Sequence, residues 1–85
     1  MFISYDSEAD AVYVKLRSDV EHSADTREID MWRYADYDEH GELIGVEFLR
    51  ASHGIPLLGV PAAEAVGEAI RTLPTVASFV IYPAA

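Results

Sequence analysis

An 85-residue chain without cysteine has room for one small domain, and it lacks disulfide bonds and thiolate chemistry. Fifteen acidic and six basic residues give it a net charge of −9, which argues against nucleic acid and anionic membranes as partners because both bind basic surfaces. A hydrophobic fraction of 51% favours an ordered core, and a domain this small is expected to hide surplus apolar surface by self-association.

The first predicted elements form a β-hairpin. Residues 2–5 are rich in β-forming side chains, and residues 6–10 are turn formers whose side chains can bond to nearby backbone. Residues 11–17 alternate apolar and polar side chains, which is typical of a half-buried strand. Residues 18–26 are polar and without periodicity, so we expect an exposed loop between this hairpin and the next.

A second hairpin is predicted from residues 28–38 and 42–49. The loop between these strands contains Gly41, which suits the left-handed position of a three-residue hairpin loop. Such a loop pairs Asp38 with Glu42 and thereby fixes the register of the two strands.

This register decides which side chains share a face of the second hairpin. It places Arg33 opposite Glu47, and we expect an ion pair between them. One face receives Trp32, Tyr34, Ile44, Val46 and Phe48, and the other receives Ile29, Met31, Arg33, Tyr37, Leu43, Glu47 and Leu49. Large apolar groups on both faces do not suit a solvated sheet surface, so we expect one face to contact a second copy of the chain.

The second half of the chain contributes one helix and one strand. Residues 51–60 form a loop, residues 61–73 form an amphipathic helix that Pro74 closes, and residues 75–82 form a strand apolar enough to be shielded on both sides. The order is four strands, a helix and a fifth strand. We therefore predict the α+β class, with one helix packed on a small antiparallel sheet of hairpins, in a single domain spanning residues 1–85.

Two motifs stand out in the first 52 residues. The first is Tyr5-Asp6-x-Glu8-x-Asp10-Ala11-x-Tyr13-Val14, and the second is Tyr37-Asp38-x-x-Gly41-x-Leu43-x-Gly45-Val46-Glu47-x-Leu49-x-Ala51-Ser52. Together they resemble the small bacterial proteins called domain of unknown function 2283, over residues 2–52. The resemblance implies a hairpin-rich fold, and some members of that family look like the antitoxin half of toxin–antitoxin gene pairs. It carries over no catalytic residues, and residues 53–85 extend beyond the usual core of the family.

The motif residues have physical roles of their own in building a fold. Asp6 and Asp10 bracket a turn and are expected to accept bonds from backbone N–H groups. Gly45, inside a strand, marks a bulge or a closely packed neighbour. Glu47 lies among apolar residues and needs a partner if it is buried. We assign structural roles to Tyr5, Asp6, Asp10, Tyr13, Gly41, Gly45, Glu47 and Ser52.

Few residue patterns point to metal or cofactor chemistry. The run Asp6-x-Glu8-x-Asp10 lacks the central glycine and distal glutamate of a calcium loop, so we interpret it as an acidic turn. The three histidines, His22, His40 and His53, occupy separate loops without ligand spacing. We therefore expect neither a metal nor a cofactor.

Two functional hypotheses remain. The first is a non-enzymatic interaction module, self-associating as a dimer or higher oligomer, whose acidic surface binds a basic protein such as a nuclease-like toxin. The alternative is a small hydrolase or ligand-binding domain that uses the adjacent Ser52 and His53 together with Glu47. The N-terminus does not resemble a signal peptide and no apolar stretch could span a bilayer, so we expect a cytoplasmic protein.

Two further observations bear on these hypotheses. Thirteen of the fifteen acids lie in residues 1–50. A partner-binding surface would require Asp30, Asp36 and the loop 19–25 to converge on one face, whereas an acidic proteome background or halophilic adaptation would scatter the acids evenly. Aromatic residues could instead form a platform for stacking a ligand, although aromatic side chains at strand spacing more often pack in a core or an interface. The pairs considered for such a platform are Trp32 with Tyr34 and Tyr5 with Tyr13.

Overall fold

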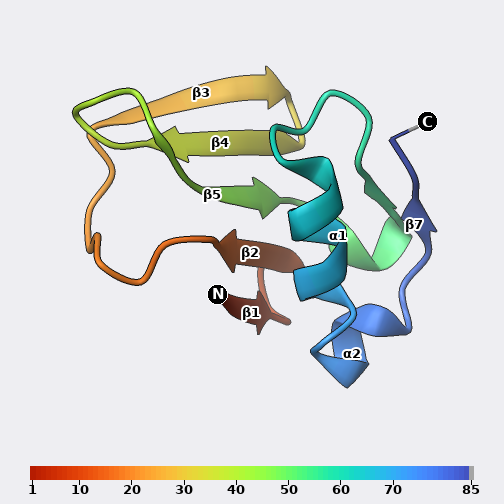
Figure 1. Ribbon diagram of the computed structural model, residues 1–85. Coiled ribbons are helices and arrows are strands. Elements are labelled where there is room, and N and C mark those ends of the chain that lie inside the picture. The colour runs from red at the N-terminus through yellow and green to blue at the C-terminus, as the bar shows by residue number, and fades with distance from the viewer. Residues whose placement is uncertain (85) are drawn as a thin grey trace.

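Five antiparallel strands form the main sheet, in the order β1-β2-β5-β4-β3 (Figure 1). They are β1 (Phe2–Asp6), β2 (Ala11–Lys15), β3 (Asp25–Asp30), β4 (Arg33–Tyr37) and β5 (Leu43–Phe48). The computed structural model describes residues 1–84, so Ala85, the last residue of the expected domain, lies outside the described residues. The predicted α+β class and the antiparallel sheet of hairpins are confirmed.

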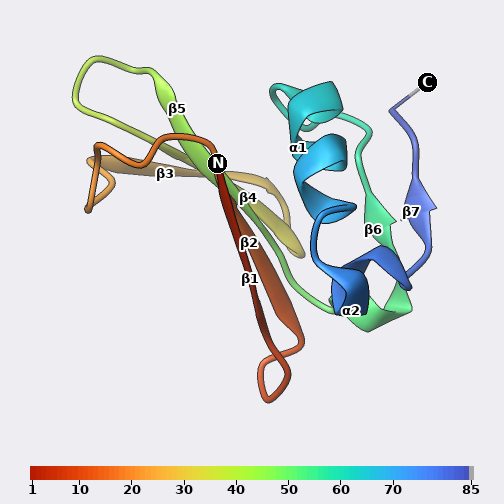
Figure 2. The ribbon, with the colours of Figure 1, turned by 60° about the horizontal axis from the view of Figure 1, so that its bottom comes forward.

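The chain after residue 50 covers one face of this sheet. It forms the 3-10 turn η1 (Ala51–His53), strand β6 (Ile55–Pro56), helices α1 (Ala63–Ile70) and α2 (Pro74–Ala77), and strand β7 (Ile81–Tyr82), which pairs in parallel with β6. Figure 2 shows all of these elements on the same side of the main sheet. Within residues 1–84, no helix has the length and apolar character that crossing a membrane requires.

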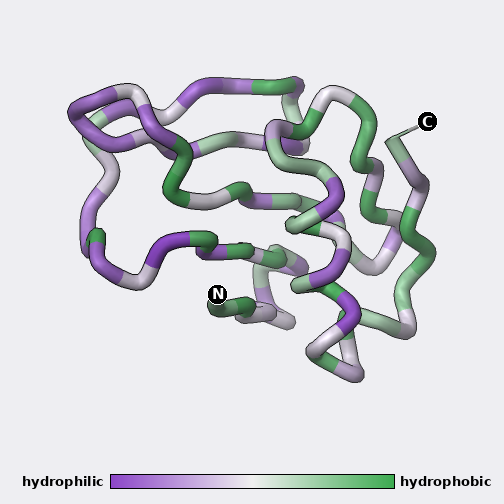
Figure 3. The backbone as a smooth tube through the Cα atoms, in the orientation of Figure 1, coloured by the Kyte–Doolittle hydropathy of each residue, from purple (hydrophilic) through white to green (hydrophobic). Residues whose placement is uncertain are grey.

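The hydrophobic core lies between strands β2 and β5 and the covering segment after residue 50. The strand alternation predicted for residues 11–17 is confirmed, because Val12 and Val14 are fully buried. Figure 3 shows hydrophobic residues along β2 and β5, whereas most of the edge strand β3 is hydrophilic. The fully buried side chains of the core cluster include Val12, Val14, Val46 and Phe48 from the sheet, and Ile55, Val66, Ile70 and Val76 from the covering segment.

Strand β3 begins at Asp25, inside the stretch 18–26 that was predicted as a loop, and β3 and β4 together replace the single strand predicted over residues 28–38. The chain reverses at Met31 and Trp32, where Asp30 Oδ1 accepts a hydrogen bond from the Trp32 N–H (3.0 Å). This bond closes a tight turn without glycine or proline, so the usual sequence signals of a turn are missing. The reversal adds an edge strand to the sheet that the sequence analysis did not predict.

The loop of the second hairpin is as predicted. Gly41 has a φ angle of 79°, which is the left-handed conformation expected for it. The Asp38 N–H donates a hydrogen bond to the Glu42 carbonyl oxygen (2.8 Å), so these two residues close the loop.

A β-bulge at Ile44 then shifts the register of β4 and β5 by one residue. Tyr37 still pairs with Leu43, but the pairs beyond the bulge are Asp36 with Gly45, Tyr34 with Glu47 and Arg33 with Phe48. A shift of one residue moves each side chain to the other face relative to its partner strand. The predicted ion pair between Arg33 and Glu47 is therefore wrong, and so is the placement of Tyr34 on the face of Val46 and Phe48.

Arg33 instead ties the β3–β4 turn to the covering segment. Its Nε and Nη2 atoms donate to Asp30 Oδ2 at 3.0 and 2.8 Å. Its Nη1 atom donates to the carbonyl oxygens of Pro56 (3.1 Å) and Leu58. The side chain is only 11% exposed, so this arginine joins the two segments under partial exclusion of water.

The C-terminal predictions are right for the helix and wrong for most of the last strand. The predicted helix over residues 61–73 is α1, which is shorter at both ends. Pro74 does not simply end it but begins α2, because proline fits the first turn of a helix. Residues 75–82 therefore form a strand only at β7, where Tyr82 is 53% exposed and not shielded on both sides.

Replacing Arg33 by Met should lower the free energy of unfolding by about 2–3 kcal/mol, because it removes charge-assisted hydrogen bonds to Asp30 and two carbonyl groups. The matched control is Arg27→Met, which breaks an exposed pair with Asp25 and should cost less than about 1 kcal/mol. Urea unfolding measures both. Equal losses in the two variants would contradict the bracing role of Arg33.

Candidate functional site

The face of the main sheet away from the helices carries two rows of side chains. Residues directly opposite each other on neighbouring strands point to the same side, so the register defines each row. One row runs Ser4, Tyr13, Glu47, Tyr34 and Glu28, and the other runs Phe2, Lys15, Gly45, Asp36 and Thr26. We call these ten residues the open face. They alternate along the strands with residues that point toward the core.

Tyr13 lies across the middle of the open face. Its hydroxyl donates a hydrogen bond to Asp36 Oδ2 (2.9 Å), and the Thr26 hydroxyl donates to Oδ1 of the same carboxylate (2.6 Å). The Tyr13 side chain passes over Gly45, where a Cβ atom would stand 2.6 Å from the tyrosine oxygen and 2.5 Å from the Val14 carbonyl oxygen. The missing side chain at Gly45 therefore lets Tyr13 reach across β5 to β4. Burial, and then the bond to Asp36, raises the pKa of the Tyr13 hydroxyl, so it stays a donor.

Glu47 occupies the centre of the open face, between Tyr13 and Tyr34. Its side chain is half-buried, and its carboxyl group makes no hydrogen bond or ion pair within residues 1–84. Burial raises the pKa of this carboxyl, and the nearby Asp36 carboxylate raises it further. The ionised form of Glu47 is thus poorly solvated and lies beside a like charge, which makes it costly in the free protein.

The open face is negatively charged. Glu28, Asp36 and Glu47 supply carboxyl groups to it, and Lys15 supplies its one basic group. Lys15 lies opposite Gly45 and makes no ion pair within the described part of the chain. Chemically, the face can hold a positively charged group by ion pairing, with tyrosine rings on either side.

Asp10 connects the β1–β2 turn to Ser52 in η1, the 3-10 turn that follows β5. Its Oδ1 atom accepts hydrogen bonds from the Tyr5 hydroxyl (2.8 Å) and the Ser52 N–H (3.0 Å), and Oδ2 accepts one from the Ser52 hydroxyl (2.6 Å). The bond from the Ser52 hydroxyl is the largest cause that lowers the pKa of the Asp10 carboxyl. Asp10 also has a φ angle of 52°, in the left-handed region that aspartate tolerates better than most residues. We call Tyr5, Asp10 and Ser52 the hairpin latch.

Asp6 has a local structural role in the same turn. Its Oδ1 atom accepts hydrogen bonds from the N–H groups of Glu8 (3.0 Å) and Ala9 (3.2 Å). The Asp6 carboxylate thus faces its own turn, whereas that of Asp10 faces Ser52.

Within residues 1–84, no group of three or more histidine, cysteine, aspartate or glutamate side chains could hold a metal ion.

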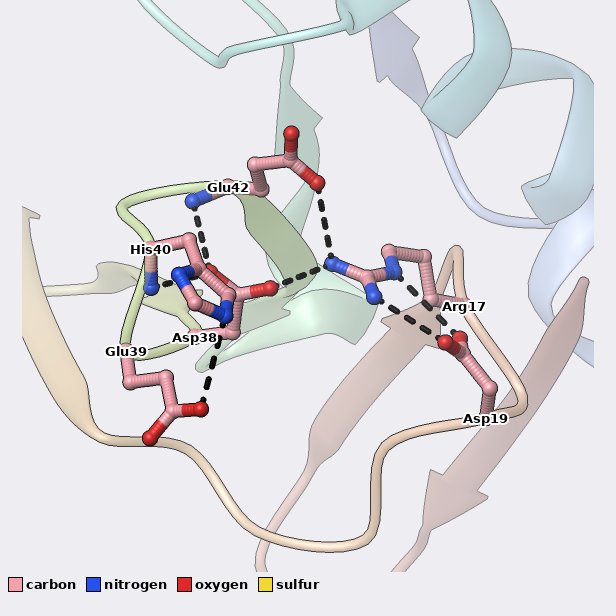
Figure 4. A network of polar contacts seen from close by, with 6 residues as sticks. All are labelled: Arg17, Asp19, Asp38, Glu39, His40 and Glu42. Carbon is pink, nitrogen blue, oxygen red and sulfur yellow. Dashed lines mark hydrogen bonds and ion pairs between the residues drawn. The ribbon is translucent and has the colours of Figure 1, made fainter.

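Arg17 gathers a second group of acids at the hairpin loop beside Gly41 (Figure 4). Its guanidinium lies within 3.0 Å of Asp19, 2.6 Å of Asp38 and 3.4 Å of Glu42. Hydrogen bonds to Asp38 from the Glu42 backbone and from Arg17 lower the pKa of the Asp38 carboxyl. Arg17 offsets one of these three negative charges, and its bonds to Asp38 and Glu42 hold the loop in shape.

The acids considered for a partner surface do not all converge. Asp30 binds Arg33 at the turn that β6 approaches, and Asp19 binds Arg17. Asp36 points to the open face. The condition that a partner-binding surface places on these three regions is therefore not met, and their distribution gives no electrostatic support to a partner.

The residues considered for hydrolysis lie on different surfaces. Glu47 is on the open face, whereas the Ser52 hydroxyl donates to Asp10 in the hairpin latch. This bond lowers the pKa of the Asp10 carboxyl. His53 lines a groove beside Trp32 instead.

In each of the two pairs of aromatic residues considered as stacking platforms, the two members lie apart from each other. Tyr13 and Tyr34 lie on the open face, with Glu47 between them. Tyr5 belongs to the hairpin latch. Trp32 lies at the β3–β4 turn, where the guanidinium carbon of Arg50 is 4.9 Å from its ring centre.

The sequence analysis did not identify Asp36 as a contact of Tyr13. A signal for its position was present, because Tyr34 and Asp36 alternate with Ala35, which is 1% exposed. The predicted register concealed it, since without the bulge at Ile44 these side chains fall on the core face. Because the prediction left out the extra residue at Ile44, it placed Tyr34 and Asp36 on one face of the hairpin and Glu47 on the other.

Replacing Glu47 by Gln should raise the stability at neutral pH and leave it nearly unchanged in acid. The pKa of Glu47 is raised in the folded state, so the folded state binds this proton more tightly than the unfolded state. Ionisation therefore costs stability as pH rises from the unfolded pKa to the folded one, and the full cost persists above it. Urea unfolding at about pH 7 and about pH 3 measures the effect.

The control for this prediction is Glu21→Gln, which removes an exposed carboxyl from the loop between β2 and β3. It should change stability little at either pH. A Glu47→Gln protein no more stable than the wild type at neutral pH would contradict the burial of Glu47.

The comparisons with known proteins can now be set beside this geometry. A family model described as "Protein of unknown function (DUF2283)" matches residues 3–52. No curated protein and no solved structure matches the chain. The matched segment contains the hairpin latch and every residue of the open face except Phe2. Because the match covers more than half of the chain, as the resemblance of the two motifs implied, the protein belongs to the DUF2283 family.

Proposed function

We propose that this protein is a non-enzymatic interaction module whose open face binds a positively charged segment of a protein partner. The chief support is the position of Asp36 and Glu47, two neighbouring carboxyl groups on an uncovered sheet face. Within residues 1–84 neither makes an ion pair with a basic side chain. A partner that brings a lysine or arginine to this face supplies the missing counter-charge.

The tyrosines of the open face favour a protein as the partner. Tyr13 and Tyr34 flank Glu47 in one row of the sheet. Tyrosine is enriched in protein interfaces because its ring buries apolar area while its hydroxyl keeps a hydrogen-bond partner. An arginine of the partner can lie on a tyrosine ring while its guanidinium forms a bidentate pair with Glu47.

Binding of a cation offsets the cost that ionised Glu47 carries in the free protein. The raised pKa shows that burial and Asp36 disfavour the carboxylate form. A guanidinium or ammonium group beside Glu47 reverses that preference, because an opposite charge stabilises the ionised form. The carboxylate form of Glu47 is therefore unfavourable in the free protein, and a basic partner that pairs with it gains binding free energy.

A small toxin that acts on nucleic acid is a partner of this kind, which makes the role antitoxin-like. The substrate face of such a toxin must be basic in order to hold phosphate groups. An acidic sheet face laid over it would exclude the substrate, and opposite charges would speed the encounter.

Co-expression with the flanking genes, followed by purification on a tag, should recover a basic protein in stoichiometric amount. Reversing two charges of the open face in Glu28→Lys/Glu47→Lys should then slow association with that purified partner by about tenfold or more at low salt. Surface plasmon resonance measures the rate.

The matched control is Glu64→Lys/Glu68→Lys, which makes the same change of net charge on exposed positions of α1. Its association rate should stay close to that of the wild type. Equal slowing in both double variants would show an effect of net charge alone, and no slowing in either would reject the open face as the binding surface.

Self-association is proposed through the sheet edge at β1, whose residues Phe2 and Ser4 also border the open face. This strand lies at the end of the sheet order and pairs there with β2, so within residues 1–84 its other side presents free N–H and C=O groups. Phe2, its first residue, is 61% exposed, and the preceding Met1 is 68% exposed. The opposite edge strand β3 carries Asp25, Arg27 and Glu28, and such charges protect an edge from pairing. Antiparallel pairing of two β1 strands about a two-fold axis would join the two sheets.

Light scattering at micromolar concentration should therefore report twice the subunit mass of 9.4 kDa. Phe2→Lys should shift the protein toward the monomer, because it replaces an exposed apolar side chain of the proposed interface by a charged one. Leu58→Lys, a control at a position that is 67% exposed elsewhere, should remain dimeric. A wild-type monomer across the whole concentration range would reject this interface.

A further inference from the structure

A groove beside the β3–β4 turn carries positive charge in an otherwise acidic protein. Its volume of about 360 Å³ lies within the range of small-molecule sites. The side chains that matter here are Trp32, Arg33, Arg50, His53 and Tyr82, and no acidic residue lines the groove. The whole chain has fifteen acids against six Lys and Arg residues, so this local reversal of charge sets the groove apart from the open face.

Arg50 is the groove residue with uncommitted donors. Its guanidinium carbon lies 4.9 Å from the centre of the Trp32 ring, and it makes no ion pair within residues 1–84. Arg33 differs, because its donors are bound to Asp30 and to two carbonyl groups. Arg50 can therefore turn its guanidinium group toward a phosphate or carboxylate without breaking a hydrogen bond or an ion pair.

Two aromatic side chains give the groove flat walls. Trp32 is 41% exposed and Tyr82 is 53% exposed, so part of each side chain is free. Pairing of Pro56 with Tyr82 between β6 and β7 positions the tyrosine. Its ring packs against Gly54, where a Cβ atom would stand 2.6 Å from Tyr82 Cε2. The groove therefore depends on the absence of a side chain at Gly54.

We propose that this groove binds a small molecule in which a flat aromatic ring carries a phosphate or a carboxylate. The ring stacks on the exposed surface of Trp32 or Tyr82, and the anionic group accepts hydrogen bonds from Arg50, with His53 beside it. The acidic surface elsewhere repels such an anion, so charge directs it to this groove. This site is independent of the protein partner proposed for the open face.

The test follows the indole N–H resonance of Trp32 by NMR, because the chain has a single tryptophan. Adenosine monophosphate and indole-3-acetate, which carry a phosphate and a carboxylate, are titrated separately, so the two arms show which anion is preferred. At least one of them should shift the Trp32 indole and Gly54 amide signals. It should bind about tenfold more tightly than adenosine, which lacks the anion, or inorganic phosphate, which lacks the ring.

Arg50→Gln should weaken binding of that probe about tenfold or more, whereas Arg71→Gln, at an exposed arginine just after α1, should leave it within about twofold. Adenosine binding as tightly as adenosine monophosphate, together with no response to indole-3-acetate, would overturn the proposal. So would the absence of any shift of Trp32 with either anionic probe. Both comparisons use the unmodified protein and hold even if the Arg50 variant folds poorly.

Discussion

The pairing of β2 with β5 is the contact on which the two faces of this protein depend. In the order β1-β2-β5-β4-β3, it joins the N-terminal hairpin to the other strands. On its inner side it aligns Val14 with Val46, and both are fully buried. On its outer side it brings Tyr13 over Gly45 and beside Glu47. The hydrophobic core and the proposed binding face are thus two sides of one set of backbone hydrogen bonds, so a change that loosens the pairing damages both.

The hairpin latch connects the two ends of the segment that the family model matches. The match runs from residue 3 to residue 52, and Ser52 at its end bonds to Asp10 near its beginning across 42 residues of sequence. The matched segment is therefore a sheet whose first turn is hydrogen-bonded to its last residue, Ser52. It stops before Ile55, Val66 and Ile70, which cover the inner side of that sheet. In this chain residues 53–84 supply the cover, and with it one wall of the positively charged groove.

The parts of the fold that could be predicted are those set by local chemistry. Strand alternation placed Val12 and Val14 in the core, and the glycine at position 41 predicted the second hairpin loop. The turn at residues 31–32 has no glycine or proline signal, whereas Gly45 next to the bulge at Ile44 indicated a bulge or a close neighbour without giving the register. The candidate site was therefore found only in part, since Tyr13, Gly45 and Glu47 were singled out without Asp36, their neighbour across the bulge.

The bulge also makes the length of β5 as important as its composition. Ile44 is the extra residue of β5, because the pairs on either side of it are Tyr37 with Leu43 and Asp36 with Gly45. Deleting it would leave the pairs from Gly45 to Phe48 in place and would turn Leu43 and the hairpin loop to the other side relative to them. A deletion of a single codon would accordingly reorient the loop where Arg17 binds Asp38 and Glu42, although it would remove no residue of the open face.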